Sequence, residues 1–296
     1  MAALGEFPYF VGIDVGSSSV KVVALHDAGA GFDVAFRACE AHKGSIAACA
    51  RKLLIAAVSS EELAGGACAG IAATGACAET IREAAPGVRV LEDVPAMTLG
   101  AAVMAPGVRS IVQVGAQNAF FVTGVADGRA PQFAMNEGCA AGTGSFFEDQ
   151  MGRLGLSIED YSAIVERAST APRLSGRCAV FAKTDIIHRQ QEGVPIEDIL
   201  LGLCYAMVKS YKATIVRKMP VEAPVLLAGG VVRNAGVVRA VRDVFKLDEG
   251  DLIADTAGVY VQAAGAAAHA AKAVRAGGHD AFVPVDLGNL IAALFV

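Results

Sequence analysis

The hydrophobic pattern begins with two apolar runs separated by a short turn of small residues. Residues 9–15 form the first run, residues 16–19 are one glycine and three serines, and residues 20–25 form the second run. Two such runs joined by a small-residue turn are typical of a β-hairpin. Because no helix follows the turn, the pattern excludes the dinucleotide-binding and P-loop arrangements, which place their glycine loop at the start of a helix.

The same pattern begins again at residue 110. An apolar run at residues 110–114 is followed by a turn at residues 115–118 and by a second run at residues 119–125. Two hairpins built alike predict a duplicated fold. Before the second hairpin, the periodicity predicts helices at residues 45–59, 78–85 and 96–104 and strands at residues 70–74 and 88–91.

The two halves are separated by residues 105–108, where Pro106 and Gly107 do not support a continued helix. After the second hairpin the pattern is more helical. It predicts helices at residues 144–154, 158–168, 184–191, 196–218 and 261–276, and one more strand at residues 223–228. Since strands and helices are mixed in both halves, the sequence predicts the α/β class.

Composition narrows the function classes. At 296 residues the chain is long enough for two domains. Its formal charge is -5 and it has no run of basic residues, so the sequence does not indicate a positively charged surface that would bind nucleic acid. No stretch approaches a membrane span, and residues 1–10 lack the pattern of a secretory signal, so we expect a cytoplasmic protein. An odd number of cysteines, 7, argues against a disulfide framework and leaves thiols or metal ligands.

Two cysteines stand next to turns that border predicted helices. Cys139 precedes a glycine-rich turn, and Cys178 follows Arg177, so helix N–H groups and a positive charge would stabilise a thiolate-bound cluster. Their separation, 178 minus 139 or 39 residues, is unlike the C-x-x-C spacing of a self-contained site. Two thiolates are half of what a four-iron cluster needs, so such a chain would complete the site as a dimer. The other cysteines, which we expect to be small buried hydrophobic side chains, are Cys39, Cys49, Cys68, Cys77 and Cys204.

The first turn carries groups that suit a phosphate. Its backbone N–H groups and serine hydroxyls can hold phosphate oxygens, with Asp14 just before the turn and Lys21 just after it. Asp14 could hold a magnesium ion through water, and Lys21 could neutralise phosphate charge. The alternative, for this turn taken alone, is that Asp14 and Gly16 simply make a tight hairpin.

Further small-residue turns follow in a fixed order. Residues 115–118 form the second turn, Gly229 and Gly230 form a third ahead of Asn234, and Gly265 lies in the last predicted helix. This ordered set is similar, over nearly the whole chain, to the superfamily of sugar kinases, heat-shock chaperones and actin. The resemblance implies a two-domain actin-like ATPase fold with duplicated ribonuclease-H-like mixed sheets flanked by helices.

The resemblance also implies domain limits. Residues 1–106 would form the first actin-like ATPase domain, with the helix at residues 261–276 packed back on it. Residues 107–260 would form the second domain and carry the two cysteines. Residues 277–296 would then be a C-terminal extension.

Two segments narrow the family further. Residues 136–144 read NEGCAAGTG and residues 178–185 read CAVFAKTD. Both closely resemble the ATPase activators of 2-hydroxyacyl-CoA dehydratases and the related ATPase subunits of benzoyl-CoA reductases. The resemblance implies that Cys139 and Cys178 bind one [4Fe-4S] cluster shared by a homodimer or a pair of like subunits. It also implies reduction by a ferredoxin or flavodoxin, and ATP-dependent delivery of a low-potential electron to an acyl-CoA dehydratase or reductase under anaerobic conditions.

The same resemblance implies a site for ATP or ADP with magnesium. Asp14 would bind the magnesium ion, and Asp14 and Gln117 would be the catalytic residues. The other residues expected around the nucleotide are Gly12, Gly16, Ser17, Ser18, Ser19, Lys21, Gly115, Ala116, Gly229, Gly230, Asn234 and Gly265.

The second turn departs from the family pattern. The family typically has Asp-Ile-Gly-Gly-Gln-Asp, whereas residues 113–118 read QVGAQN, so Gln113 and Asn118 replace two acids. An amide cannot serve as a general base or as an anionic metal ligand. In one hypothesis Asp14 anchors the magnesium, Gln117 orients the attacking water, and turnover is retained. In the other, the chain is a slow or silent ATPase paired with a more active sister subunit.

Two other functions stay open on the same fold. One is a kinase of a small hydroxylated molecule, for which Gln113 is a poor candidate for the required carboxylate base. The other is a weakly hydrolysing subunit that uses nucleotide only as an assembly signal. About four irons per two chains would favour the electron-transfer activator over both.

Overall fold

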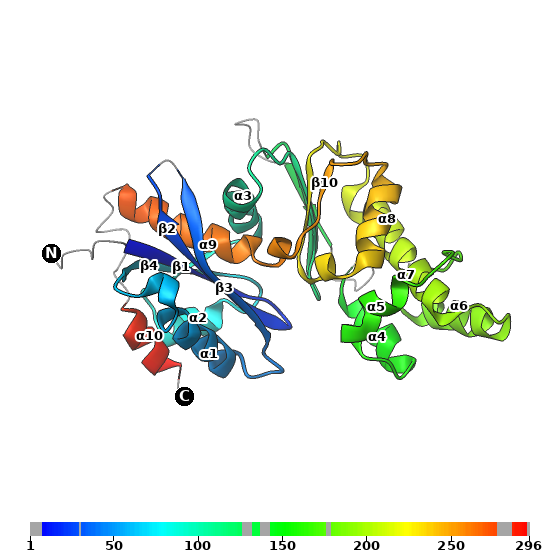
Figure 1. The fold of residues 1–296 in the computed structure, drawn as a ribbon, viewed down its shortest axis with the longest axis horizontal. Coiled ribbons are helices and arrows are strands. Elements are labelled where there is room, and N and C mark those ends of the chain that lie inside the picture. Colours follow the sequence, from blue (N-terminus) through cyan, green and yellow to red (C-terminus); the bar gives the residue numbers. More distant parts are fainter. Residues whose placement is uncertain are drawn as a thin grey trace. The chain divides into compact units, whose positions relative to one another are not determined.

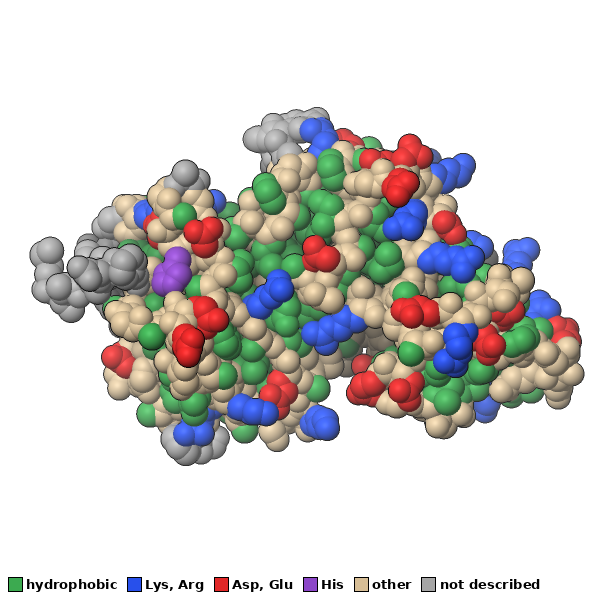
Figure 2. Space-filling model, viewed as in Figure 1, with side chains coloured by type: hydrophobic (Ala, Val, Ile, Leu, Met, Phe, Trp, Pro, Cys, Tyr) green, Lys and Arg blue, Asp and Glu red, His purple; other side chains and the backbone are tan. Residues whose placement is uncertain are grey.

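The protein is described here by a computed structural model, which covers residues 8–29, 31–125, 132–136, 143–175, 179–276 and 286–294. The chain divides into two compact units (Figure 1). Unit 1 combines Met1–Pro106 with Val259–Val296, and unit 2 is Gly107–Gly258. Acidic and basic side chains are interspersed on the face shown in Figure 2, without a large area of one sign.

Unit 1 is built on a five-stranded mixed sheet with the order β3-β2-β1-β4-β5. Its first three strands are antiparallel, and β4 and β5 continue parallel to β1. The strands are β1 (Pro8–Val15), β2 (Ser19–Asp27), β3 (Phe32–Ala41), β4 (Ala67–Thr74) and β5 (Arg89–Leu91). The hairpin predicted at the start of the chain is therefore confirmed, and it lies in the centre of the sheet.

Helices cover both faces of this sheet because its inner strands are apolar on both sides (Figure 1). Val11 and Ile13 share one core with α1 (Ile46–Val58), α2 (Glu79–Ala84) and α10 (Leu287–Ala293). Phe10 and Val23 share the other core with α9 (Val261–Arg275), against which α3 (Asp93–Met104) packs. The sequence pattern predicts no helix after residue 276, yet α10 buries Leu287 and Leu290 in the first of these cores.

Glycines allow α9 to approach its neighbours very closely. A Cβ atom on Gly265 would lie 1.7 Å from the Ala96 carbonyl oxygen, and one on Gly100 would lie 1.7 Å from the Val261 carbonyl oxygen. A Cβ atom on Gly12 would lie 1.9 Å from the Ala263 carbonyl oxygen. Only glycine permits such backbone contact. The backbone of α9 is therefore in direct contact with that of α3 on one side and that of β1 on another.

Unit 2 repeats the architecture of unit 1. Its sheet has the order β10-β9-β6-β7-β8, again with three antiparallel strands followed by two parallel ones. The strands are β6 (Ser110–Val114), β7 (Ala119–Thr123), β8 (Gln132–Met135), β9 (Val225–Ala228) and β10 (Leu252–Ile253). Two mixed sheets with the same strand pattern confirm the predicted α/β class and the duplication.

The helices of unit 2 are α4 (Ser145–Arg153), α5 (Tyr161–Val165), α6 (Ala179–Gln191), α7 (Ile196–Tyr211) and α8 (Ala235–Phe245). The helix predicted at residues 196–218 ends as an α-helix at Tyr211 and continues as a π-helical turn, Lys212–Val216. The helix predicted at residues 158–168 is instead a 3-10 turn, Ile158–Asp160, followed by the short α5.

One described segment, Ile196–Val216, is long and apolar enough to cross a membrane by length and composition. In unit 2, however, 67% of its most apolar window is buried. The Tyr211 hydroxyl at the end of α7 also donates to the Phe120 carbonyl oxygen in β7 at 2.6 Å. The apolar character of α7 is therefore that of a core helix.

Candidate functional site

The first turn holds a buried ion pair. Asp14 and Lys21 are opposite each other in the β1–β2 hairpin, and Lys21 Nζ lies 3.1 Å from Asp14 Oδ2. Asp14 is only 4% exposed. The turn is closed by the Gly16 amide, which donates to the Ser19 carbonyl oxygen at 3.0 Å. A carboxylate and an ammonium group thus meet directly beneath a glycine-serine turn, the chemistry expected for magnesium and phosphate.

The loop after β4 covers the same carboxylate. Thr74 pairs with Asp14 in the parallel register, is fully buried, and has a hydroxyl without a hydrogen-bond partner among the described residues. Gly75 follows with φ +98, and a Cβ atom there would lie 2.5 Å from Asp14 Oδ1. The Cys77 amide donates to the Val15 carbonyl oxygen at 2.9 Å and fixes the loop. Asp14 is therefore enclosed by backbone that only a glycine at position 75 allows.

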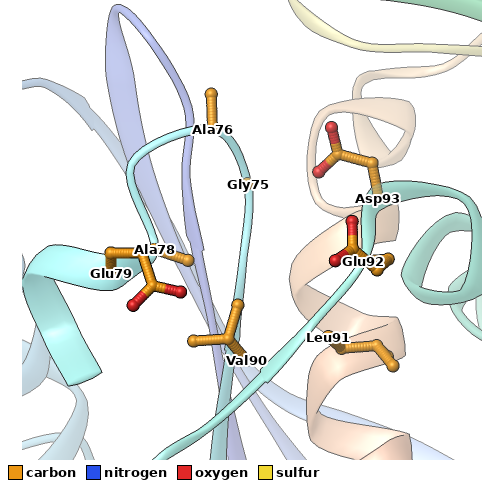
Figure 3. A pocket seen from close by; sticks show the side chains of 8 residues that line it. All are labelled: Gly75, Ala76, Ala78, Glu79, Val90, Leu91, Glu92 and Asp93. Carbon is orange, nitrogen blue, oxygen red and sulfur yellow. The ribbon is translucent and has the colours of Figure 1, made fainter.

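A pocket of about 230 Å³ opens beside this loop (Figure 3). Figure 3 shows Glu79 on one side of the Gly75 loop and Glu92 and Asp93 on the other. Asp93 Oδ1 accepts a hydrogen bond from Gln262 Nε2 at 3.1 Å. The pocket lies at the carboxyl ends of the parallel strands β4 and β5, where ligands of α/β sheets usually bind. The sequence prediction omitted these three acids, although the acid pair directly after the strand at residues 88–91 was a usable signal.

The second turn is braced by its own side chains. The Gly115 amide donates to the Asn118 carbonyl oxygen at 2.8 Å. Gln113 is 4% exposed. The orientation of its side-chain amide that gives both the nitrogen and the oxygen a hydrogen-bond partner has the nitrogen donating to the Asn118 carbonyl oxygen at 3.3 Å. In that orientation the oxygen accepts from the Gly115 amide at 3.2 Å. The side chain at this position therefore stabilises the turn, while Gln117 is exposed at its tip.

The third turn lies against the second. Gly229 has φ +94, its amide donates to the Gly258 carbonyl oxygen at 3.1 Å, and a Cβ atom there would lie 2.2 Å from the Val114 carbonyl oxygen. Gly230 has open space around its Cβ position. Asn234 caps α8, since its Oδ1 accepts from the Gly236 amide at 2.9 Å and the Val237 amide at 3.2 Å. Each unit therefore gathers its predicted turn residues at one edge of its sheet.

The other residues predicted to surround the nucleotide differ in how far they are exposed to solvent. Ser17 and Ser19 are half-buried, and Ser18 is exposed, as expected for a turn that faces a ligand. Ala116 is half-buried in the second turn. Gly12 and Gly265 have a packing reason for being glycine, and their contact with nucleotide stays a prediction.

Cys139 and Cys178 lie outside the described residues, so the structure says nothing of them. The described cysteines are free thiols. Burial raises the pKa of Cys68 and of Cys204 to about 12, and burial also raises the pKa of Cys49. Without a metal ion nearby, such thiols stay protonated near neutral pH. Among the described residues, no group of three or more histidine, cysteine or acidic side chains could hold a metal ion.

Comparison with known proteins gives a consistent result. The model of the BadF/BadG/BcrA/BcrD ATPase family matches residues 11–270. The activator of lactoyl-CoA dehydratase from Anaerotignum propionicum is 31% identical over 244 residues, which cover 81% of this chain and 90% of that protein. The (R)-2-hydroxyglutaryl-CoA dehydratase activating ATPase from Acidaminococcus fermentans is 26% identical over 239 residues, 79% of this chain and 87% of that protein.

Solved structures show the same fold. Component A of the Acidaminococcus fermentans (R)-2-hydroxyglutaryl-CoA dehydratase has a TM-score of 0.78 and 24% identity, with 90% of this chain and 99% of that chain covered. The activator of 2-hydroxyisocaproyl-CoA dehydratase from Clostridium difficile with bound ADPNP has a TM-score of 0.77 and 24% identity, covering 94% and 99%. The family model, the relatives and the fold agree with the predicted resemblance, and the chain belongs to the BadF/BadG/BcrA/BcrD ATPase family.

Proposed function

We propose that this protein is an ATP-dependent activator that delivers a low-potential electron to an acyl-CoA dehydratase or benzoyl-CoA reductase-type partner. The names of its relatives, which include dehydratase activators and a benzoyl-CoA reductase subunit from Thauera aromatica, support this role. The electron donor would be a ferredoxin or flavodoxin, and the protein would work in the cytoplasm. The working unit would be a homodimer or a pair with a like subunit.

In the proposed ATP-binding step, the buried Asp14 would take part in binding MgATP. Its carboxylate is paired with Lys21 at 3.1 Å. When MgATP binds, Lys21 would turn to a phosphate oxygen and Asp14 would hold the magnesium ion through water. The glycine-serine turn, whose residues are Gly16, Ser17, Ser18 and Ser19, would supply N–H groups and hydroxyls to the phosphates. The buried, unpartnered Thr74 hydroxyl beside Asp14 supports a polar ligand here.

Unit 2 carries the second and third small-residue turns, for which we also propose nucleotide contacts. The backbone of Gly115 and Ala116 would contact phosphate, and Gly229 and Gly230 would let backbone approach the ribose and base. Gln117, exposed at the tip of its turn, would orient the attacking water. Its amide can donate to and accept from that water but cannot remove a proton. Hydrolysis would therefore rest on positioning and on the charges of Lys21 and magnesium.

Cys139 and Cys178 would supply two of the four thiolates of a [4Fe-4S] cluster, which stores and releases one electron at low potential. Cys178 directly precedes Ala179, the first residue of α6, and the segment of Cys139 leads into α4. Both would thus lie near helix N-termini, whose N–H groups favour negative charge. The observation that carries this proposal is the pair of family-like cysteine segments, residues 136–144 and 178–185.

Anaerobic reconstitution with iron and sulfide tests the proposal. We expect about four irons per two chains, and loss of iron in the variants Cys139→Ala and Cys178→Ala. Cys39→Ala, a half-buried cysteine in the same chain, is the matched control and should retain the iron. Full iron content in both cluster variants, or none in the unaltered protein, would refute the proposal.

A further inference from the structure

The hydroxyl group of Thr74 is buried without a hydrogen-bond partner. Thr74 is the last residue of β4 and is 0% exposed, and within the described part of the chain its Oγ1 has no partner. Such a hydroxyl has lost its hydrogen bonds to water and gained none in the protein, which destabilises the fold. A valine of similar shape would not carry this cost. The threonine at this position therefore needs an explanation other than stability.

Strand pairing places Thr74 beside Asp14 on one face of the sheet. Thr74 is opposite Asp14 in the parallel register of β4 with β1, and Asp14 is opposite Lys21 in the antiparallel register of β1 with β2. Side chains at paired positions share a face, and alternation along β1 and β4 puts this face on the side of Phe10 and Ala72, which pack with α9. The hydroxyl, the carboxylate and the ammonium group therefore form one row where β1 and β4 end.

The residues at this edge fit a magnesium ion that keeps most of its water. Among the described residues, no group of three or more histidine, cysteine or acidic side chains could hold a metal ion directly. Magnesium loses water reluctantly and is usually held in proteins by one or two carboxylates, with waters in other positions. Each of those waters donates hydrogen bonds and needs acceptors. Asp14 offers a carboxylate, and the Thr74 hydroxyl in the paired position can accept a hydrogen bond.

The surroundings of the loop after Thr74 favour a cation. Gly75 and Ala76, which directly follow Thr74, line the pocket of about 230 Å³, and Glu92 and Asp93 line its other side (Figure 3). A pocket of this size has room for several water molecules. Carboxylates along its wall favour positive charge over negative charge. A hydrated cation therefore suits the space beside this loop.

We propose that Thr74 is a positioning residue for magnesium, with its hydroxyl accepting a hydrogen bond from a water of the ion that Asp14 holds. The hydroxyl then gains a partner only when the metal is bound. The threonine lowers the stability of the metal-free protein and raises the affinity for the metal-bound nucleotide, a known trade between stability and function. This inference rests on the proposed function, since it needs MgATP at Asp14.

The test is the dependence of nucleotide affinity on magnesium, measured by titration calorimetry with the non-hydrolysable analogue ADPNP. We define the magnesium factor as the affinity with magnesium divided by the affinity with chelator. For Thr74→Val we expect the factor to fall by about 2–10-fold, the worth of one hydrogen bond. The affinity with chelator should stay unchanged, and the melting temperature without metal should rise. Thr74→Ser keeps the hydroxyl and should retain the factor.

Thr123→Val is the matched control. Thr123 in β7 is 2% exposed, and its Oγ1 accepts from Ser110 Oγ at 3.3 Å. The same substitution there removes the partner of a buried hydroxyl, so it should lower the melting temperature and leave the magnesium factor unchanged.

Three results would count against the inference. An unchanged magnesium factor in folded Thr74→Val would overturn it and leave the proposed function intact. A loss in Thr74→Ser as large as that in Thr74→Val would also overturn it, because the hydroxyl would then not be the group responsible. No binding of ADPNP with magnesium by the unaltered protein would contradict the proposed MgATP site itself, and the inference with it.

Discussion

Replacement of Asp14 by asparagine tests the ion pair with Lys21 in the proposed nucleotide site. The side chain of Lys21 is 13% exposed and lies 3.1 Å from Asp14, so Asp14→Asn leaves a largely buried ammonium group without its counter-charge. Removal of one partner from a buried pair costs about 3–5 kcal/mol. Because Lys21 reaches some water, we take the lower figure, about 3 kcal/mol, which corresponds to a fall in melting temperature of roughly 6–12 °C.

The assay is thermal unfolding followed by circular dichroism, without nucleotide and with chelator present. The double variant Asp14→Asn with Lys21→Met replaces the pair with a neutral and an apolar side chain, and should recover most of the lost stability. Glu40→Gln is the matched control because it breaks the exposed pair between Glu40 and Lys52, and it should not change the melting temperature measurably. Asp14→Asn that melts like the unaltered protein would refute the reasoning.

The same variant links stability to ligand binding. We expect MgATP to raise the melting temperature of the unaltered protein, because a ligand that binds only the folded chain stabilises it. Asp14→Asn should gain little from MgATP and release phosphate at the background rate, since the proposed magnesium ligand is lost. A rate of phosphate release in Asp14→Asn equal to that of the unaltered protein would favour a different metal ligand.

Further predictions concern packing, an unpaired hydroxyl and pH. Thr74→Val removes a buried hydroxyl without a partner and should stabilise nucleotide-free protein by about 1 kcal/mol, which a higher melting temperature would show and a lower one would contradict. Gly100→Ala should destabilise unit 1 by about 3 kcal/mol or more in urea unfolding, because its Cβ atom would lie 1.7 Å from the Val261 carbonyl oxygen. Gly152→Ala in α4, where the Cβ position is open, should be tolerated. The backbone amide of Thr170, with the Thr170 hydroxyl and the Ser169 amide, holds the pKa of Asp198 below its ordinary value. The stability contributed by Asp198 should therefore be complete above about pH 4 and be lost as the pH falls through the lowered pKa, and Asp198→Asn should flatten this dependence in melts at different pH. An equally steep acid dependence in Asp198→Asn would contradict it.

The hairpins could be predicted from sequence because their signals are local. In β1 and β6 an apolar run ends in a small-residue turn, and the returning strand follows at once. Strand β3 was missed because it is an edge strand whose residues are mostly half-exposed, so charged residues such as Asp33 and Arg37 interrupt the apolar pattern. Helix α8 was missed although Asn234 ahead of it is a good N-cap.

The site was predictable to a lesser degree. The turn residues and Asp14 carry family-like motifs, but the pocket lined by Glu79, Glu92 and Asp93 depends on which strand ends become neighbours. That neighbourhood arises from the parallel pairing of β4 with β5, a contact that no local pattern reveals. Likewise, the hydrogen bonds from the Gln113 side chain to the Asn118 carbonyl oxygen and the Gly115 amide depend on the orientation of that side chain in the folded unit.

The central claim, that nucleotide acts on an electron-carrying cluster, is tested most directly by anaerobic redox titration of the reconstituted protein with and without MgADPNP. We expect a low-potential one-electron transition that shifts when the analogue is present, with a tenfold change in relative affinity appearing as about 59 mV. Asp14→Asn should titrate alike in both conditions. Identical titration curves of the unaltered protein with and without saturating analogue, or no redox transition at all, would contradict the account.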